Sequence, residues 1–194
     1  MSKSIMRWVA ILMILLASDI LFFAQSPAPQ ERRSVGKELD VWVSKTEEHL
    51  VAAADAMPEQ KYGFAPKAGE FSGVRTFGEQ VKHVSAANYI LGSAALGQKP
   101  PNGEHGESAP DFLKSKADIV KYLRDSFAYL HRAAAVVNDN NETETIKAFD
   151  SRTRPGLIVD ALCHSWNHYG QMIEYLRMNG VVPPASRLDI RSAR

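Results

Sequence analysis

Residues 155–180 read PGLIVDALCHSWNHYGQMIEYLRMNG, an amphipathic stretch of about seven helical turns. Apolar residues recur in it at helical spacing, and Pro155 and Gly180 are typical of a helix start and a helix stop. Both histidines of His164-x-x-x-His168 belong to its apolar stripe, so we expect them to point into the protein interior. The residues of that stripe are Leu157, Ala161, His164, His168, Met172 and Tyr175.

Three upstream segments show the same periodicity, and none of the chain shows convincing strand alternation. Thr76 and Glu79 form a predicted capping box, and Pro58 and Gly97 are predicted helix stops. Four apolar stripes are buried most simply in an all-α four-helix bundle without a sheet. The connection 98–114 is long enough to run the length of a helix, so we expect a crossover. The upstream helices are predicted from Val35 to Met57, from Thr76 to Leu96 and from Ser115 to Asn138.

The chain begins with a predicted export signal. Lys3 and Arg7 precede an apolar run that ends at Phe23. A retained membrane anchor is the alternative, but Asp19 near the middle of a span costs roughly 2.5–3.5 kcal/mol on insertion scales. We therefore expect a periplasmic or secreted protein with no stable membrane insertion after processing. The predicted organisation is a signal peptide at 1–24, a linker at 25–34, the bundle at 35–185 and a tail at 186–194.

Composition narrows the classes of partner. The 194 residues contain 45% hydrophobic residues, enough for one domain with a core. The formal net charge is only +1, so nucleic acid is not an expected partner. The single cysteine, Cys163, excludes an internal disulfide framework and a cysteine-rich zinc module. The chain could also pair as a homodimer.

The pair His164 and His168 is a candidate for metal binding. Residues at i and i+4 share one helical face, so both imidazoles can reach one ion. Residue 165 is serine, which excludes the His-Glu-x-x-His zinc proteases. His83 is the candidate third ligand because it lies on a largely apolar strip of the second helix. The alternative is a satisfied core histidine beside a surface one. The other histidines, which we do not expect to be ligands, are His49, His105 and His131.

Residues 35–184 resemble the DinB-like, or YfiT-like, metalloenzyme superfamily. The resemblance implies a four-helix bundle of up-down-down-up type with a divalent metal on three histidines. By motif position those are His83, His164 and His168. The matching motifs are Met57-Pro58-x-x-Lys61-Tyr62-x-Phe64-x-Pro66, Thr76-Phe77-Gly78-Glu79-x-x-x-His83, Asn88-Tyr89, His164-x-x-x-His168, Gly170-Gln171, Tyr175-Leu176-Arg177 and Gly180-x-Val182-Pro183-Pro184.

The resemblance implies two enzymatic themes, metal-dependent hydrolysis and thiol-dependent transfer. Export favours hydrolysis of a small molecule, because low-molecular-weight thiols belong to the reducing cytosol. The expected cofactor is one divalent ion of Zn, Ni or Fe, and three histidines leave coordination positions open. A non-enzymatic, stress-associated metal-binding bundle is the alternative from another class.

No general base is identified by the sequence. Glu79 and Glu174 are near the histidines, but either can serve as a helix cap or a surface charge. Cys163 adjoins His164 yet points about 100° away on an ideal helix, so we expect it to pack rather than to bind metal. The aromatic residues expected in the core rather than against substrate are Tyr62, Tyr89 and Trp166.

Overall fold

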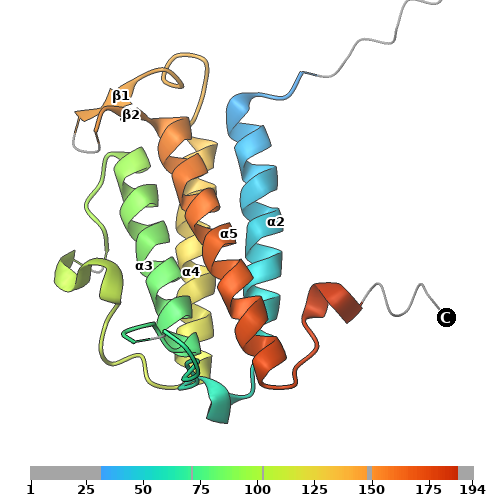
Figure 1. The fold of residues 1–194 in the computed structure, drawn as a ribbon. Helices are drawn as coiled ribbons and strands as arrows, with labels where there is room; N and C mark the ends of the chain where they lie inside the picture. Colours follow the sequence, from blue (N-terminus) through green and yellow to red (C-terminus); the bar gives the residue numbers. More distant parts are fainter. Residues whose placement is uncertain (1–31, 71, 102, 148–149, 188–194) are drawn as a thin grey trace, which may run out of the picture. The chain divides into compact units, whose positions relative to one another are not determined.

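The structure, a computed structural model, describes residues 32–70, 72–101, 103–147 and 150–187. The predicted signal peptide, most of the predicted linker and residues 188–194 of the predicted tail lie outside this part. Within it, no helix is both long enough and apolar enough to cross a membrane. In the described residues, four long helices make up the bundle (Figure 1). They are α2 (Val35–Ala56), α3 (Phe77–Leu96), α4 (Lys116–Ala135) and α5 (Arg154–Met178).

The helices follow an up-down-down-up path (Figure 1). Helices α3 and α4 are parallel, and the crossover between them includes the short 3-10 segment η2 (Gly103–Ser108). Helix α3 packs against α4 and α5, and α2 packs against the same two helices. This arrangement places α3 antiparallel to α5, which brings the second and fourth predicted helices side by side.

The helix boundaries are set largely by polar caps. The hydroxyl of Thr76 accepts from the Glu79 N–H, and the Glu79 carboxylate accepts from the Thr76 N–H at 2.8 Å, so the predicted capping box is present. Gly97 ends α3 in the left-handed conformation, with φ of 69°. Such a conformation costs little only for residues without a Cβ. The start of α3, and with it the orientation of its histidine, is therefore encoded locally.

One feature differs from the prediction of a bundle without a sheet. Strands β1 (Thr145–Ile146) and β2 (Arg152–Thr153) form an antiparallel pair of two residues each. Asp150 and Ser151 have positive φ values where the chain turns before β2. Two-residue strands are too short to produce an alternating pattern, so sequence periodicity does not reveal them. The hairpin leads directly into α5.

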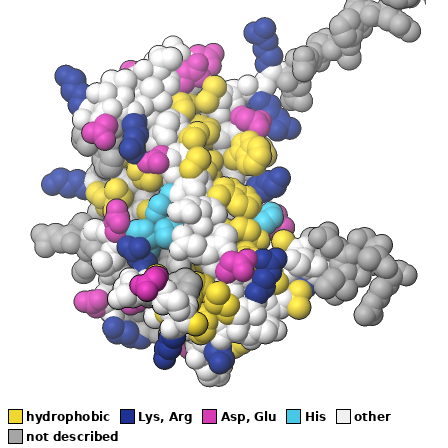
Figure 2. All heavy atoms as spheres, in the orientation of Figure 1, with side chains coloured by type: hydrophobic (Ala, Val, Ile, Leu, Met, Phe, Trp, Pro, Cys, Tyr) yellow, Lys and Arg dark blue, Asp and Glu magenta, His cyan; other side chains and the backbone are white. Residues whose placement is uncertain are grey.

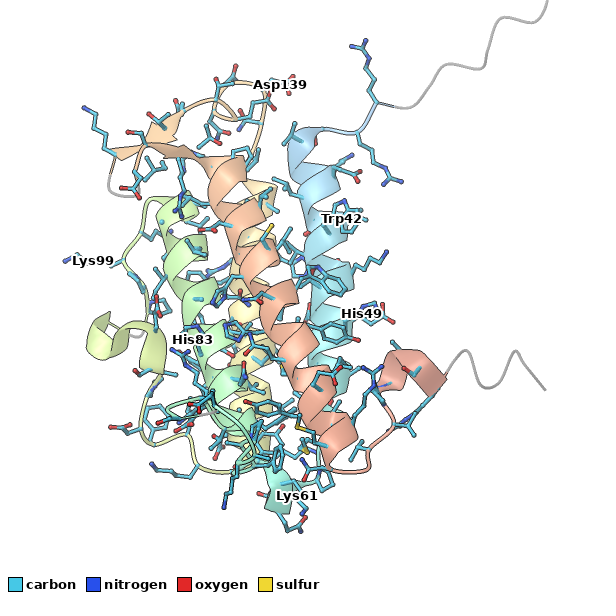
Figure 3. All side chains as sticks on the ribbon, in the orientation of Figure 1. Trp42, His49, Lys61, His83, Lys99 and Asp139 are labelled. Atoms are coloured by element: carbon cyan, nitrogen blue, oxygen red, sulfur yellow. The ribbon has the colours of Figure 1, made fainter. Side chains whose placement is uncertain are left out.

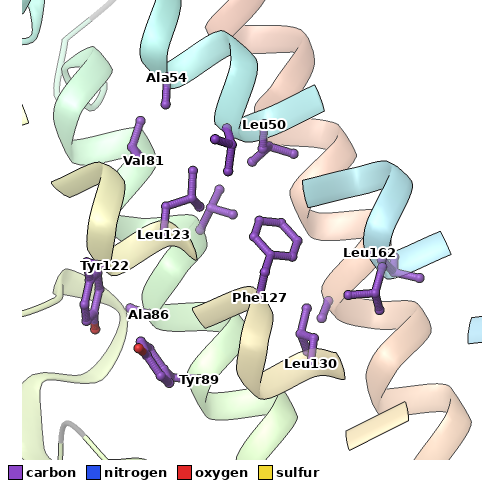
Figure 4. Close-up of a cluster of buried hydrophobic side chains, with 14 of the residues drawn as sticks. Leu50, Ala54, Val81, Ala86, Tyr89, Tyr122, Leu123, Phe127, Leu130 and Leu162 are labelled. Atoms are coloured by element: carbon purple, nitrogen blue, oxygen red, sulfur yellow. The ribbon is translucent and has the colours of Figure 1, made fainter. Parts of the chain in front are cut away.

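The core lies between the four helices (Figure 4). Phe127 of α4 is fully buried and belongs to one cluster with Leu50 of α2, Val81 of α3 and Leu162 of α5. A polar layer crosses this core between α3, α4 and α5. Asn88 donates to the Ser126 hydroxyl at 3.2 Å and accepts from the Ser165 hydroxyl at 3.3 Å. Buried polar groups need such partners, and the layer continues along α3 and α5 into the histidine cluster.

Candidate metal centre

Three histidine side chains meet between α3 and α5. His83 comes from α3, where Figure 3 labels it, and His164 and His168 come from successive turns of α5. One ring nitrogen of each lies within 4.8 Å of the others, and the ring centroids are 4.6–4.8 Å apart. His83 and His168 are only 5% and 7% exposed, and His164 is half-buried. This cluster could hold one metal ion.

Hydrogen bonds determine which nitrogen two of these rings can offer. The Nδ1–H of His83 donates to the main-chain carbonyl of Glu107 at 3.1 Å. The Nδ1–H of His168 donates to the Gln80 side-chain oxygen at 2.5 Å. Because each acceptor requires a proton on Nδ1, the lone pair of each ring is on Nε2. Both Nε2 atoms are therefore available as ligands.

His164 lacks such a partner. Its Nδ1 is buried and has no hydrogen-bond partner among the described residues. Its Nε2 lies 3.0 Å from the Nε2 of His83. Because the His83 Nε2 carries a lone pair, a second lone pair facing it would be repulsive unless a proton or a cation lies between them. An all-imidazole donor set suits Zn, Ni or Fe, so the residues present fit a divalent transition metal.

Burial keeps two of these imidazoles neutral. Burial is the largest cause that lowers the pKa of His168, to about 4, and the neighbouring His164, His83 and Arg75 add repulsion. Burial, followed by the neighbouring His83, also lowers the pKa of His164. Metal ions bind the neutral ring, so at neutral pH an ion does not compete with the second proton that would charge either of these two rings.

Residues 43–172 match the family model of the DinB superfamily. The chain belongs to the DinB superfamily. Its fold is also similar to that of a conserved protein from Enterococcus faecalis, known from a crystal structure, with a TM-score of 0.61 and 15% sequence identity. That similarity covers 75% of this chain and 97% of the Enterococcus faecalis chain, and at this identity it concerns the fold alone. Among curated proteins there is no match.

In this DinB-superfamily chain, a polar cleft of about 550 Å³ lies between the start of α3 and the crossover, and none of the three histidines lines it. Glu107 and its neighbours in the crossover form one wall of this cleft. The main-chain carbonyl of Glu107 also accepts the hydrogen bond from His83. Histidine side chains reach the surface next to acidic and basic groups on the face that Figure 2 shows. The volume is in the usual range for small-molecule sites. The cleft is lined by Gly73, Val74, Arg75, Glu79, Lys82, Glu107, Ser108 and Asp111.

The two carboxylates considered as bases have other contacts. Glu79 accepts hydrogen bonds from the main chain and the hydroxyl of Thr76, and the main-chain bond is the largest cause that lowers its carboxyl pKa. Glu174 pairs with Arg177 at 2.7 Å on the surface. A third carboxylate, that of Glu107, lies 3.8 Å from Nδ1 of His83. Sequence reasoning missed Glu107 because the short 3-10 segment η2, in which it lies, is too short to give a spacing signal.

The remaining histidines are placed away from the cluster where the structure describes them. His131 lies between Asp40, at 2.5 Å, and Glu47, at 3.2 Å, which links α4 to α2. The His49 ring is tilted against that of Trp166, with the ring centroids 5.2 Å apart. The side chain of His105 lies outside the described part of the chain.

Of the aromatic residues predicted for the core, Tyr62 and Tyr89 are buried. Trp166 is only half-buried, so for this residue the prediction was wrong. Its ring packs against Tyr169 of α5 and His49 of α2, where these two helices meet. Cys163 is exposed and does not pack in the interior as predicted. At 100° per residue, both residues point away from the apolar stripe of α5.

Proposed function

We propose that this chain binds one divalent ion of Zn, Ni or Fe through His83, His164 and His168. We further propose that it acts outside the cytosol as a metal-dependent hydrolase of a small molecule. The observation that carries the proposal is the meeting of three ring nitrogens within 4.8 Å on two facing helices. Superfamily membership, shown by residues 43–172, supports it independently of the geometry.

The chemistry of the donor set supports an open site. With three imidazoles as ligands, a bound ion would keep positions open for water or a substrate oxygen, and would supply Lewis acidity to either of them. The protein's own part is to keep the rings of His164 and His168 neutral by burial and to hold the Nδ1 protons of His83 and His168. Half-buried His164 marks the side on which solvent reaches the cluster.

Replacing the ligands tests the metal site. His83→Ala and the double variant His164→Ala, His168→Ala should lose most bound metal, because two or fewer imidazoles remain. His49→Ala, His105→Ala and His131→Ala are the controls and should keep it. Elemental analysis of tag-free protein, before and after loading with Zn or Ni, gives the metal content per chain. Full metal content in the double variant would rule out this site.

Activity is tested separately with panels of esters, amides and lactones. Metal-dependent hydrolysis by the wild-type protein, lost in the double variant, supports the hydrolase. Metal uptake without turnover favours a non-enzymatic metal-binding bundle. Turnover that requires an added low-molecular-weight thiol favours a transferase.

The proposal that the protein is exported rests on the predicted signal peptide in the first 24 residues. We expect the protein isolated from its native host to begin near residue 25 and to fractionate with periplasmic or secreted proteins. N-terminal sequencing of that protein decides the matter. An intact Met1 in the membrane fraction would support the anchor instead.

A further inference from the structure

Two glutamines stand three residues away from histidines of the cluster, one on each facing helix. Gln80 precedes His83 on α3, and Gln171 follows His168 on α5. The Gln80 amide N–H donates to the Gln171 oxygen at 3.0 Å, and the Gln80 oxygen accepts from His168 at 2.5 Å. The chain of hydrogen bonds therefore runs from α5 to α3 and back to α5.

The side chain of Gln80 has no easy alternative to these partners. It is 2% exposed, so water does not satisfy its amide. A primary amide can adopt two orientations that differ by exchange of its oxygen and its NH2 group. One orientation presents an acceptor to Nδ1 of His168, and the other presents a donor. With a donor there, the proton of a neutral ring must move to Nε2, and that nitrogen then has no lone pair for a metal.

The contact with α5 accompanies the first of these orientations. The Gln171 oxygen accepts from the NH2 group of Gln80 while the Gln80 oxygen faces His168, and because Gln171 is also an amide, it favours this orientation only while its own oxygen faces Gln80. Gln171 itself is exposed, so water can satisfy the rest of its amide. His83 needs no such help, because its acceptor is a main-chain carbonyl of the crossover, which cannot exchange with a donor.

We propose that Gln80, oriented by Gln171, is a positioning residue that keeps the proton of His168 on Nδ1 and its Nε2 free for the metal. The inference rests on the proposed metal site, which it deepens. Partners of this kind typically change metal affinity by about 10- to 100-fold when they are removed. Gln80 is thus expected to matter for binding without touching the ion.

The test compares four variants by zinc affinity, measured in competition with a chromophoric chelator. Gln80→Met keeps the side-chain length but removes the acceptor, and should weaken binding by about 10- to 100-fold. Gln80→Glu restores an acceptor and should bind close to wild type or tighter. Gln171→Ala should weaken binding by less than Gln80→Met. Ser85→Ala, the matched control, removes a buried hydroxyl that bonds its own helix and should change nothing.

A second measurement reads the tautomer without metal. In ¹H–¹⁵N spectra of the imidazole rings at neutral pH, His168 should carry its proton on Nδ1 in the wild type and in Gln80→Glu. In Gln80→Met the tautomer equilibrium of the His168 ring should shift toward the Nε2–H form. If Gln80→Met weakened zinc binding only by disturbing the packing, the tautomer of His168 would not change. Glutamate at position 80 would then not restore the affinity either.

The outcomes separate the two proposals. A wild-type protein that binds no zinc contradicts the metal site, and the spectra still decide the role of Gln80. Wild-type affinity in Gln80→Met, or an Nε2–H tautomer of His168 in the wild type, overturns the inference. If Gln80→Met does not fold, exposed Gln171→Ala carries the test, and an unchanged affinity there overturns the inference as well.

Discussion

The imidazole of His168 shows how strongly burial acts on a single residue of this site. Its pKa is lowered to about 4, so it stays neutral in the folded protein while the unfolded chain binds a proton near its ordinary pKa of 6.5. Between these values the unfolded state holds more protons than the folded state. The metal-free protein should therefore lose stability as the pH falls from about 6.5 toward about 4.

Urea unfolding of chelator-treated protein at pH 7 and pH 5 measures this loss. We expect the free energy of unfolding to fall by about 1–2 kcal/mol from this residue. His168→Gln cannot take up the proton, so its stability should depend less on pH over the same interval. Equal pH dependence in the variant and the wild type would contradict the assignment.

Single residues also show what the sequence can and cannot predict. Helical spacing and apolar strips made His83, His164 and His168 candidates, and the family resemblance selected the same three residues. Gln80 and Glu107 were missed, because periodicity reports the face on which a residue lies and not the polar group that faces it. The bond from His168 to Gln80 spans 88 positions of the chain, and only the packing of α3 on α5 creates it.

At the scale of elements, polar side chains decide where the helices end. The capping box at Thr76 was predictable because all of its parts lie within four residues. Helix α4 ends at Ala135 rather than at the predicted Asn138. Side-chain amides of Asn138 and Asn141 donate to the carbonyl of Val136, which replaces the next helical hydrogen bonds. Asparagine competes with the backbone in this way, but its sequence position does not tell which carbonyl it takes.

Two helical glycines should respond in opposite ways to alanine. A Cβ on Gly36 of α2 would lie 2.6 Å from the carbonyl oxygens of Ala134 and Val137 at the end of α4. Backbone must move to accept it, so Gly36→Ala should destabilise the protein by about 1–3 kcal/mol. A Cβ on Gly170 of α5 meets nothing within 4 Å. Gly170→Ala should instead stabilise by about 0.5–1 kcal/mol, because alanine loses less backbone entropy.

Urea denaturation of Gly36→Ala and Gly170→Ala measures the free energy of unfolding of each variant. The substitution is the same in both, so a difference between them reports the surroundings of each glycine. A stabilising Gly36→Ala would mean that α2 and α4 do not approach as closely as the structure has them. The slope of the free energy of unfolding against urea concentration should stay unchanged in both variants, because neither substitution alters the surface exposed on unfolding.

At the scale of the whole molecule, the crossover has two consequences. It makes α3 and α4 parallel, so that α3 runs antiparallel to α5 and their histidines face one another. It also carries the Glu107 carbonyl that holds the ring of His83. The length of residues 98–114 predicted the first consequence. The second depends on where η2 settles against α3, which loop composition does not encode.

Because the three histidines join α3 to α5, a bound ion should stabilise the entire bundle. Binding to the folded state alone adds about 2.7 kcal/mol when zinc is present at 100 times its Kd. For a domain of this size that corresponds to a rise in Tm of roughly 5–10 °C. Thermal unfolding with chelator and with zinc measures the rise in the wild-type protein. The double variant His164→Ala, His168→Ala should show no such rise, because it keeps one ligand and cannot link the two helices. A wild-type Tm that is the same with chelator and with excess zinc would mean that the cluster does not bind this ion.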